Sequence, residues 1–361
     1  MLRFLTRHAQ WVIALFGFLV FGLTELDWVR SSPLWQRTDG ALVDRRYLLR
    51  GTRPPNTNIV LVGVESSAFK LDTLAPEEIA ASPVLQLMLR PTWDRRIYAA
   101  VLEKLMNAGA KTVVFDFVFA GKTDGDDDFA RDLQKYRDRV AISEIFQDDS
   151  DSGESKKHLV TPNSRLMQPG TESMVGLANI WPDPDGTVRR VRYWTSIERE
   201  SGLMGFPDNL PHISVVALQK FQGPIALPPA DRPSYVDFQG PGGTYPPLPI
   251  ENMFVPKLWQ APPFSGGLAF SNKIVIVGPI AEIYHDVHLT PFGDMPGPEV
   301  QAQVMAALLQ RSWINEPPLW INLMLALALT WLALEFSLRI GNALLKVAAL
   351  VGATILFLIA C

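Results

Sequence analysis

The sequence predicts an α/β domain, a three-layer sandwich with a mostly parallel sheet, flanked by transmembrane helices. Three observations lead to this fold class. Short, nearly continuous apolar runs rich in valine and isoleucine recur through the middle of the chain, which is typical of strands buried on both faces. Segments with helix-start and helix-stop residues separate these runs. Longer apolar segments lie at both ends of the sequence.

The apolar runs define the predicted sheet. We expect strands at Asn58–Val64, Lys111–Phe119, Arg139–Ile145, Met174–Ile180 and Lys273–Gly278. Strands that alternate with helices at this spacing imply right-handed crossovers and helices on both faces of a parallel sheet. The side chains expected to be buried in the sheet are Val60, Val62, Val114, Val275 and Val277.

The intervening segments predict helices at Asp94–Ala108, Asp126–Tyr136, Asn209–Phe221 and Pro298–Arg311. The first stops at Gly109, a common helix terminator, and the second opens with acidic residues that suit a helix N-terminus. The last begins with proline and ends with arginine. Two segments break the pattern: a polar loop at Gln147–His158, and an irregular insertion at Pro224–Pro263 that is expected to cover one edge of the sheet.

The terminal apolar segments predict membrane spans, because a spanning helix needs roughly 20 mostly apolar residues. We expect a cytoplasmic tip and span in residues 1–29, spans at 319–338 and 343–361, and a short cytoplasmic turn at 339–342. The alternative for the first segment is a cleaved signal peptide. Thr24–Asp27 follows its apolar core without a small-residue cleavage pattern, so a signal anchor is favoured.

Basic residues near the spans predict the orientation. Arg3 and Arg7 precede the first span, and Arg339 and Lys346 flank the turn between the other two. Both basic groups should face the cytoplasm. Residues 30–318 would then form an extracytoplasmic, periplasmic domain of a multi-pass protein of the inner membrane.

Composition limits the partners and cofactors. The net charge of -4 argues against a nucleic-acid partner. The single cysteine, Cys361, allows no disulfide and no cysteine nucleophile in the central domain. No cofactor motif is present, so we expect neither a cofactor nor a metal, and we expect no enzymatic activity.

Candidate ligand-binding residues follow from one rule: ligands of open α/β sheets collect beyond the carboxyl ends of the strands. The rule selects Glu65, Ser66, Asp116, His285 and Asp286. The alternative is that these residues only cap strand ends. Trp93 and Arg95 are further candidates, because they could bind an anion or stack on a ligand. The alternative is that they fix the start of a helix to the sheet.

Weaker patterns leave further alternatives. Asp124–Asp128 resembles part of a calcium loop, but an acidic helix start fits better because no glutamate follows at the required distance. Asp183–Gly186 predicts a turn. His285 and His288 lie three residues apart without a third histidine nearby, which is weak evidence for zinc. A hydrolase built from Ser66 or Ser67 with His285 and Asp116 has the residue types but no motif.

Together these segments resemble the second class of CHASE domain over about residues 40–315. The residues that carry the resemblance are Asp44, Arg45, Ile59–Gly63, Glu65, Ser66, Trp93, Arg95–Tyr98, Ala108–Phe119, Asp183–Arg190, Lys273–Gly278, Asp286, Thr290, Pro291, Pro296, Gly297, Glu299 and Ala302. The resemblance implies a bacterial sensory input domain, usually joined through C-terminal spans to a signalling output. Its ligands are generally undefined. The sequence departs from the pattern in having two C-terminal spans where three and an effector are common.

The leading interpretation is a non-enzymatic, membrane-anchored sensor that binds a small extracellular ligand. It would pass a signal through its spans to an output that is separate or missing here. The alternative is a structural scaffold subunit of a larger membrane complex, and an extracytoplasmic hydrolase ranks third. In both leading interpretations we expect the chain to associate with other membrane proteins or with itself.

Overall fold

The computed structural model describes residues 31–148, 157–202, 209–228, 233–314, 318, 320, 321, 323, 324, 327, 328, 331 and 332. Two compact units divide the chain. One unit is Gly51–Ile314, and the other combines Met1–Arg50 with Asn315–Cys361.

The unit formed by the two ends of the chain contains one long described helix, α3 (Pro33–Arg50). This helix is polar, and among the described residues no helix is both long and apolar enough to cross a membrane. The predicted spans at 1–29 and 343–361 lie outside the described residues. The predicted span at 319–338 lies mostly outside them, with helix at its described positions.

A seven-stranded sheet forms the centre of the unit Gly51–Ile314. Its strand order is β10–β1–β11–β2–β3–β4, and β5 also pairs with β3. All pairs are parallel except β3 with β4. The strands are β1 (Ile59–Val64), β2 (Thr112–Val118), β3 (Val140–Asp148), β4 (Lys157–Val160), β5 (Val175–Leu177), β10 (Leu248–Pro249) and β11 (Ile274–Pro279).

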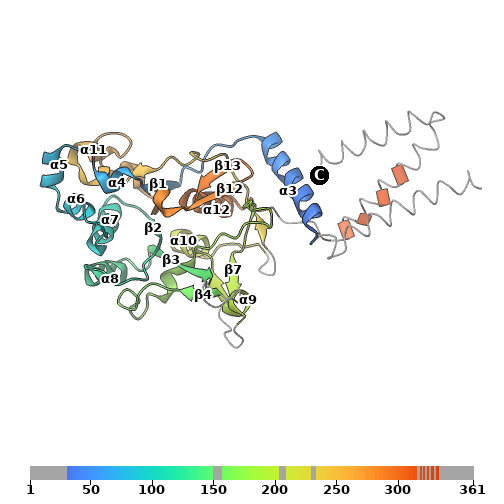
Figure 1. Cartoon of the computed structure of the whole chain (residues 1–361), viewed down its shortest axis with the longest axis horizontal. Coiled ribbons are helices and arrows are strands. Elements are labelled where there is room, and N and C mark those ends of the chain that lie inside the picture. The colour runs from blue at the N-terminus through green and yellow to red at the C-terminus, as the bar shows by residue number, and fades with distance from the viewer. Residues whose placement is uncertain are drawn as a thin grey trace, which may run out of the picture. The chain divides into compact units, whose positions relative to one another are not determined.

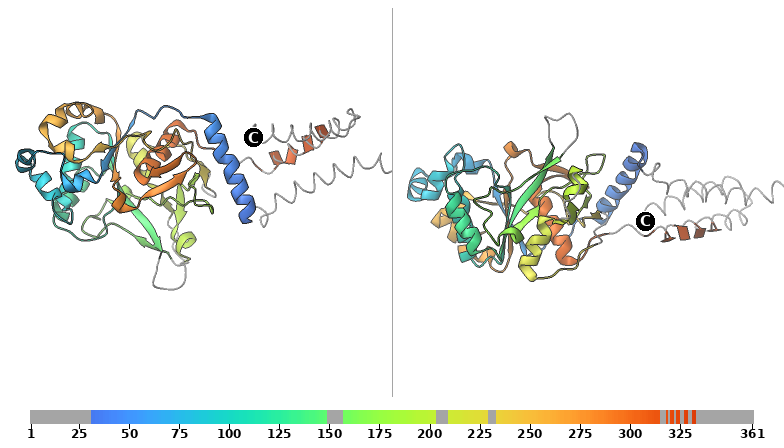
Figure 2. Two further views of the ribbon diagram at one scale, coloured as in Figure 1. Left: turned by 45° about the horizontal axis from the view of Figure 1, so that its top comes forward. Right: turned by 90° about the horizontal axis from the view of Figure 1, so that it is seen from below.

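Helices cover both faces of this sheet, as Figures 1 and 2 show for α7 and α8 on one side and α10 and α12 on the other. Their bounds are α7 (Arg95–Asn107), α8 (Asp126–Lys135), α10 (Ile213–Gln222) and α12 (Gly297–Gln310). Alternate strand residues face the two layers. Val113 and Phe115 belong to the core cluster that includes Ile97 and Phe129 of α7 and α8. Val114, between them, is fully buried but outside that cluster.

The remaining elements are short. The helices are α4 (Ser67–Lys70), α5 (Pro76–Ala81), α6 (Pro83–Met88), α9 (Ile197–Ser201) and α11 (Pro256–Gln260). The 3-10 helices are η1 (Glu172–Met174), η2 (Glu251–Phe254), η3 (Ser265–Phe270) and η4 (Glu282–Tyr284). Three two-stranded sheets pair β6 (Arg190–Val191) with β9 (Ser234–Tyr235), β7 (Trp194–Ser196) with β8 (Asn209–Pro211), and β12 (Val287–Thr290) with β13 (Gly293–Pro296).

Two of the helices that cover the sheet begin for identifiable reasons. The Asp94 side chain accepts a hydrogen bond of 2.9 Å from the Arg96 amide, which caps α7. Gly278 allows α12 to approach β11, since a Cβ at this position would lie 2.7 Å from Pro298 Cβ. Proline in the first turn of α12 costs no hydrogen bond, because that amide has no partner within the helix.

The five predicted strands are confirmed, with ends that differ by a few residues. The predicted buried valines are confirmed for Val62, Val114, Val275 and Val277. Val60 is only partly buried. Its side chain packs against the core cluster from the margin.

Two predicted boundaries are wrong. Residues 209–211 form β8 rather than the start of a helix, and α10 begins only at Ile213, where His212 Nδ1 accepts from the Ser214 amide. The predicted loop at Gln147–His158 is also too long, because Gln147 and Asp148 belong to β3 and residues 157–158 belong to β4. The rest of that loop, 149–156, lies outside the described residues. The insertion at Pro224–Pro263 covers one edge of the sheet as predicted, through β10.

Candidate functional site

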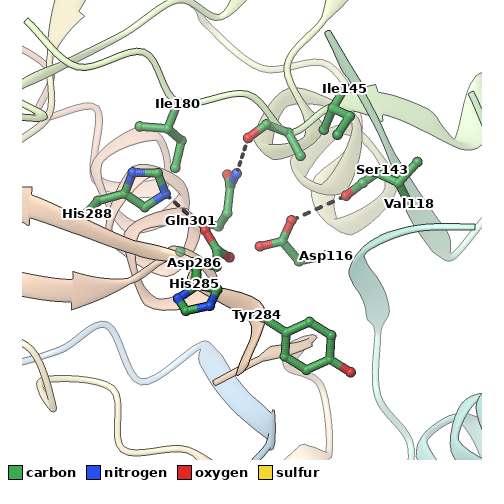
Figure 3. Close-up of a pocket in the computed structure, with 12 residues that line it drawn as sticks. Asp116, Val118, Ser143, Ile145, Ile180, Tyr284, His285, Asp286, His288 and Gln301 are labelled. Carbon is green, nitrogen blue, oxygen red and sulfur yellow. Dashed lines mark hydrogen bonds and ion pairs between the residues drawn. The ribbon is translucent and has the colours of Figure 1, made fainter. Parts of the chain in front are cut away.

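A cavity of about 290 Å³ lies at the carboxyl edge of the sheet. Its walls come from the ends of β2, β3 and β5, the segment after β11, and the first turns of α12. The lining residues are Asp116, Val118, Ser143, Ile145, Ala178, Ile180, Tyr284, His285, Asp286, His288, Gly297 and Gln301. Figure 3 shows the carboxyl groups of Asp116 and Asp286 facing one another across this space.

Asp116 enters the cavity from the middle of β2. The register between β2 and β3 shifts between Phe115 and Val118, so Asp116 lies at an irregularity of the sheet. Its Oδ1 accepts a hydrogen bond of 3.3 Å from the Ser143 hydroxyl, which also donates to the Phe115 carbonyl. Burial, with the negative charge of Asp286 as a second cause, raises the pKa of Asp116 to about 7.

Asp286 is held at the start of α12. The backbone carbonyl of Asp286 accepts a 2.9 Å hydrogen bond from the Gly297 amide. A Cβ on Gly297 would overlap the Asp286 carboxylate, so glycine is needed here for the close approach. The carboxylate also accepts from His288 Nε2 at 3.1 Å and lies where the helix dipole favours negative charge.

Gln301 contributes a buried amide from the next turn of α12. Its side chain is 1 % exposed, and its Nε2 donates to the Ala178 carbonyl over 2.9 Å. Its Oε1 is buried without a hydrogen-bond partner. Val118, Ile145 and Ile180 form the apolar wall of the cavity. The cavity thus combines two carboxylates and an amide side chain with aliphatic side chains, which suits the binding of a small molecule.

A family model for the CHASE2 domain matches residues 13–337. The chain belongs to the CHASE2 domain family. This is a family of extracellular sensory domains, which confirms the resemblance found in the sequence. Neither the curated proteins nor the solved structures contain a significant match.

Of the candidate residues predicted for this CHASE2 chain, the structure brings Asp116, His285 and Asp286 together in the cavity. The other four do not line it. Glu65 lies near Glu251, because its charge contributes to the raised pKa of Glu251, and burial raises the pKa of Glu65 itself. Ser66 precedes α4, and its side chain makes no capping hydrogen bond. Ser67 does not line the cavity either, so the predicted hydrolase constellation is not assembled.

Trp93 and Arg95 fix the start of α7 instead. Trp93 is buried, and its indole Nε1 donates to the Met88 carbonyl over 3.1 Å. The Arg95 guanidinium donates to the Gly121 carbonyl, lies 3.5 Å from Asp126 and stacks 4.7 Å from the Phe119 ring centre. Asp126 begins α8, so the acidic segment Asp124–Asp128 acts as a helix start.

Metal binding receives no support from the described ranges, in which no group of three or more His, Cys, Asp or Glu side chains could hold a metal ion. Asp183–Gly186 forms the predicted turn, closed by a 2.8 Å hydrogen bond from the Gly186 amide to the Asp183 carbonyl.

Ser143, Tyr284 and Gln301 were missed by sequence reasoning. Ser143 left a signal, since it is a hydroxyl within an apolar strand. Gln301 left none, because residues 297–308 of α12 are all buried and the helix has no polar face against which a buried glutamine would stand out.

Proposed function

We propose that the chain is a membrane-anchored sensory module whose extracytoplasmic domain binds a small ligand in the cavity at the carboxyl edge of the sheet. The observation that carries the proposal is the cavity itself, with converging polar groups at the place where open α/β sheets bind ligands. Membership of an extracellular sensory family supports the same function. In this proposal the domain binds without catalysing a reaction.

The chain path suggests how binding is passed on. Gly297 and Gln301 line the cavity, and both belong to α12. This helix ends at Gln310, shortly before the segment 319–338 that we propose as a membrane span. A ligand that contacts α12 differently in two states would shift the equilibrium between them and so the packing of the spans. The output would be a separate membrane protein or a second copy of the chain.

Thermal melting of the full chain in mild detergent tests ligand sensing. The chain is screened against a library of small metabolites and compared with Ala178→Phe, which places a ring in the cavity. We expect at least one compound to raise the melting temperature of the native chain and to leave Ala178→Phe unchanged. If no compound acts, or if all act equally on both proteins, the sensing function is wrong. The scaffold function is then favoured, provided that both proteins retain the same membrane partners.

Cysteine labelling tests the membrane topology. In a Cys361→Ser background, Ala80→Cys provides a single exposed thiol on α5. We expect an impermeant reagent to label it in cells whose outer membrane is permeabilised and whose inner membrane is intact. Labelling only after the inner membrane is broken would place the domain in the cytoplasm and contradict the proposal.

The mass of the purified particle tests association. Light scattering in mild detergent should show more than one chain or a stable partner, because the proposed signal is read through contacts of the spans with a partner. A monomer without partners would contradict both the sensor and the scaffold.

A further inference from the structure

The charges around the cavity are unbalanced. Asp116 and Asp286 both line it, and no lysine or arginine does. Among the described residues, these two carboxylates make one ion pair. It joins Asp286 Oδ1 to His288 Nε2 over 3.1 Å. Within the part of the chain that the structure describes, the side chain of Asp116 has the Ser143 hydroxyl as its one hydrogen-bond partner. Both carboxylates are partly buried. Since withdrawing a carboxylate from water without a cation is unfavourable, the cavity favours a ligand that brings positive charge.

An independent observation points to a hydrogen-bond donor on the ligand. Gln301 lines the same cavity and is 99 % buried, and its Oε1 has no hydrogen-bond partner within the described ranges. The hydrogen bond from its Nε2 to the Ala178 carbonyl fixes the orientation of the amide, because the flipped amide would place two carbonyl oxygens against each other. A buried acceptor without a partner destabilises the fold, and a hydrogen-bond donor on the ligand would remove this cost.

Three acceptor groups and an aliphatic wall define the ligand class. A primary ammonium carries three N–H donors and one positive charge, which matches Asp116, Asp286 and Gln301. The wall formed by Val118, Ile145 and Ile180 suits a short aliphatic body. We propose that the cavity binds a small organic cation, with its primary ammonium group between Asp116, Asp286 and Gln301. The proposal rests on the sensing function above and names the chemistry of its ligand.

Isothermal titration of the full chain in detergent tests this class. The probe is butylammonium, and its matched controls are butan-1-ol, which keeps the carbon chain without the charge, and butyrate, which reverses the charge. The titration is done at about pH 8, above the raised pKa of Asp116, where the Asp116 carboxylate is ionised. We expect butylammonium to bind, and neither control to do so.

Variants locate the binding. Asp116→Asn removes one carboxylate with little change of shape and should weaken butylammonium binding about 10- to 100-fold, the equivalent of one charged hydrogen bond. Gln301→Met removes the neutral acceptor and should weaken it about 3- to 10-fold. Asp294→Asn is the control, because Asp294 is exposed on β13 and does not line the cavity. This variant should bind as the native chain does.

Four results would overturn the proposal: binding of butyrate instead of butylammonium, binding of Mg²⁺ or Zn²⁺ alone, equal affinity in Asp116→Asn and the native chain, or no binding by any probe. The metabolite screen distinguishes this failure from failure of the sensing function. If a compound without an ammonium group stabilises the native chain but not Ala178→Phe, the ligand class is wrong and sensing stands. If neither the screen nor the titration detects binding, both are wrong.

Discussion

Two acidic clusters in the same domain hold their charges in opposite ways. In the turn cluster, Arg189 lies between Asp183 and Asp185, with nitrogen–oxygen distances of 3.1 and 2.8 Å. Its side chain is 2 % exposed, and its hydrogen bonds are the main cause that lowers the pKa of Asp185. In the cavity, Asp116 has no cation beside it among the described residues, and burial raises its pKa to about 7.

The difference indicates that the charges of the turn cluster stabilise the fold, whereas those of the cavity are available to a ligand. The turn cluster is complete, since its carboxylates already have a cation, and it joins the turn to strand β6 through Arg190 as well. The cavity differs, because Asp116, Asp286 and Gln301 line it and no lysine or arginine among the described residues does. A fold retains such an arrangement at a cost in stability, which is common at sites of function.

Breaking the turn cluster should have the largest effect. Arg189→Met would remove the cation that Asp185 contacts and leave Asp183 with Arg190, and it should lower the free energy of unfolding by about 3–5 kcal/mol. The measurement is urea unfolding of the full chain in detergent. Arg190→Met, at a side chain that is 30 % exposed, is the control and should cost about 1 kcal/mol. Similar losses in both variants would show that burial of Arg189 does not matter.

The same variant has a pH signature. The pKa of Asp185 is lowered, so the stability that it contributes is present above its unfolded value and is lost as the pH falls through the folded value. We expect Arg189→Met to lose less stability than the native chain as the pH falls through this range. If the variant and the native chain lost the same stability in acid, the pairing of Arg189 with Asp185 would be contradicted.

Neutralising the cavity should change the pH dependence in the opposite sense. The folded pKa of Asp116 is raised, so the folded state binds more protons than the unfolded state between about pH 4 and about pH 7. Stability should therefore fall as the pH rises through this window, by about 2–4 kcal/mol. Asp116→Asn should remove this fall, and unfolding at several pH values measures it. Asp294→Asn should retain it, and a native chain without the fall would contradict the raised pKa.

Distorting the cavity without changing its charge should have a smaller effect. In Gly278→Ala the new methyl would lie 2.7 Å from Pro298 Cβ and 3.3 Å from Asp116 Cβ, which should displace the start of α12. We expect a loss of about 1–3 kcal/mol, as for other overpacked sites, together with weaker butylammonium binding. Gly121→Ala is the control, because a Cβ there meets no atom within 4 Å. Equal melting temperatures for the two variants would show that α12 can shift at no cost.

An exposed ion pair should have the smallest effect. Arg165 and Asp127 lie 3.1 Å apart, but their side chains are 57 % and 77 % exposed. Asp127→Asn should change stability by less than about 0.5 kcal/mol, because solvent screens the pair. Thermal melting checks this, and a loss as large as that of Arg189→Met would mean that pairing alone, without burial, decides the contribution.

The sequence by itself determined the five strands and three of the four main helices, because apolar runs, capping residues and glycine stops are local signals. The start of α10 does not follow from a local signal. Asn209–Pro211 pairs with β7, and this tertiary pairing overrides the helical pattern of the sequence. The sequence also predicted that Asp116, His285 and Asp286 would lie at one edge of the sheet, because strand ends in a parallel sheet share an edge.

Only the tertiary structure decided where along that edge the cavity lies. Glu65 follows β1, and β11 separates β1 from β2, so Glu65 lies toward Glu251 rather than Asp116. Arg95 is paired with Asp126, which the sequence could not show because the two residues start different helices. Gln301 enters the cavity because α12 packs closely against Gly278. Such contacts join residues far apart in the chain, and their geometry depends on packing that no local pattern records.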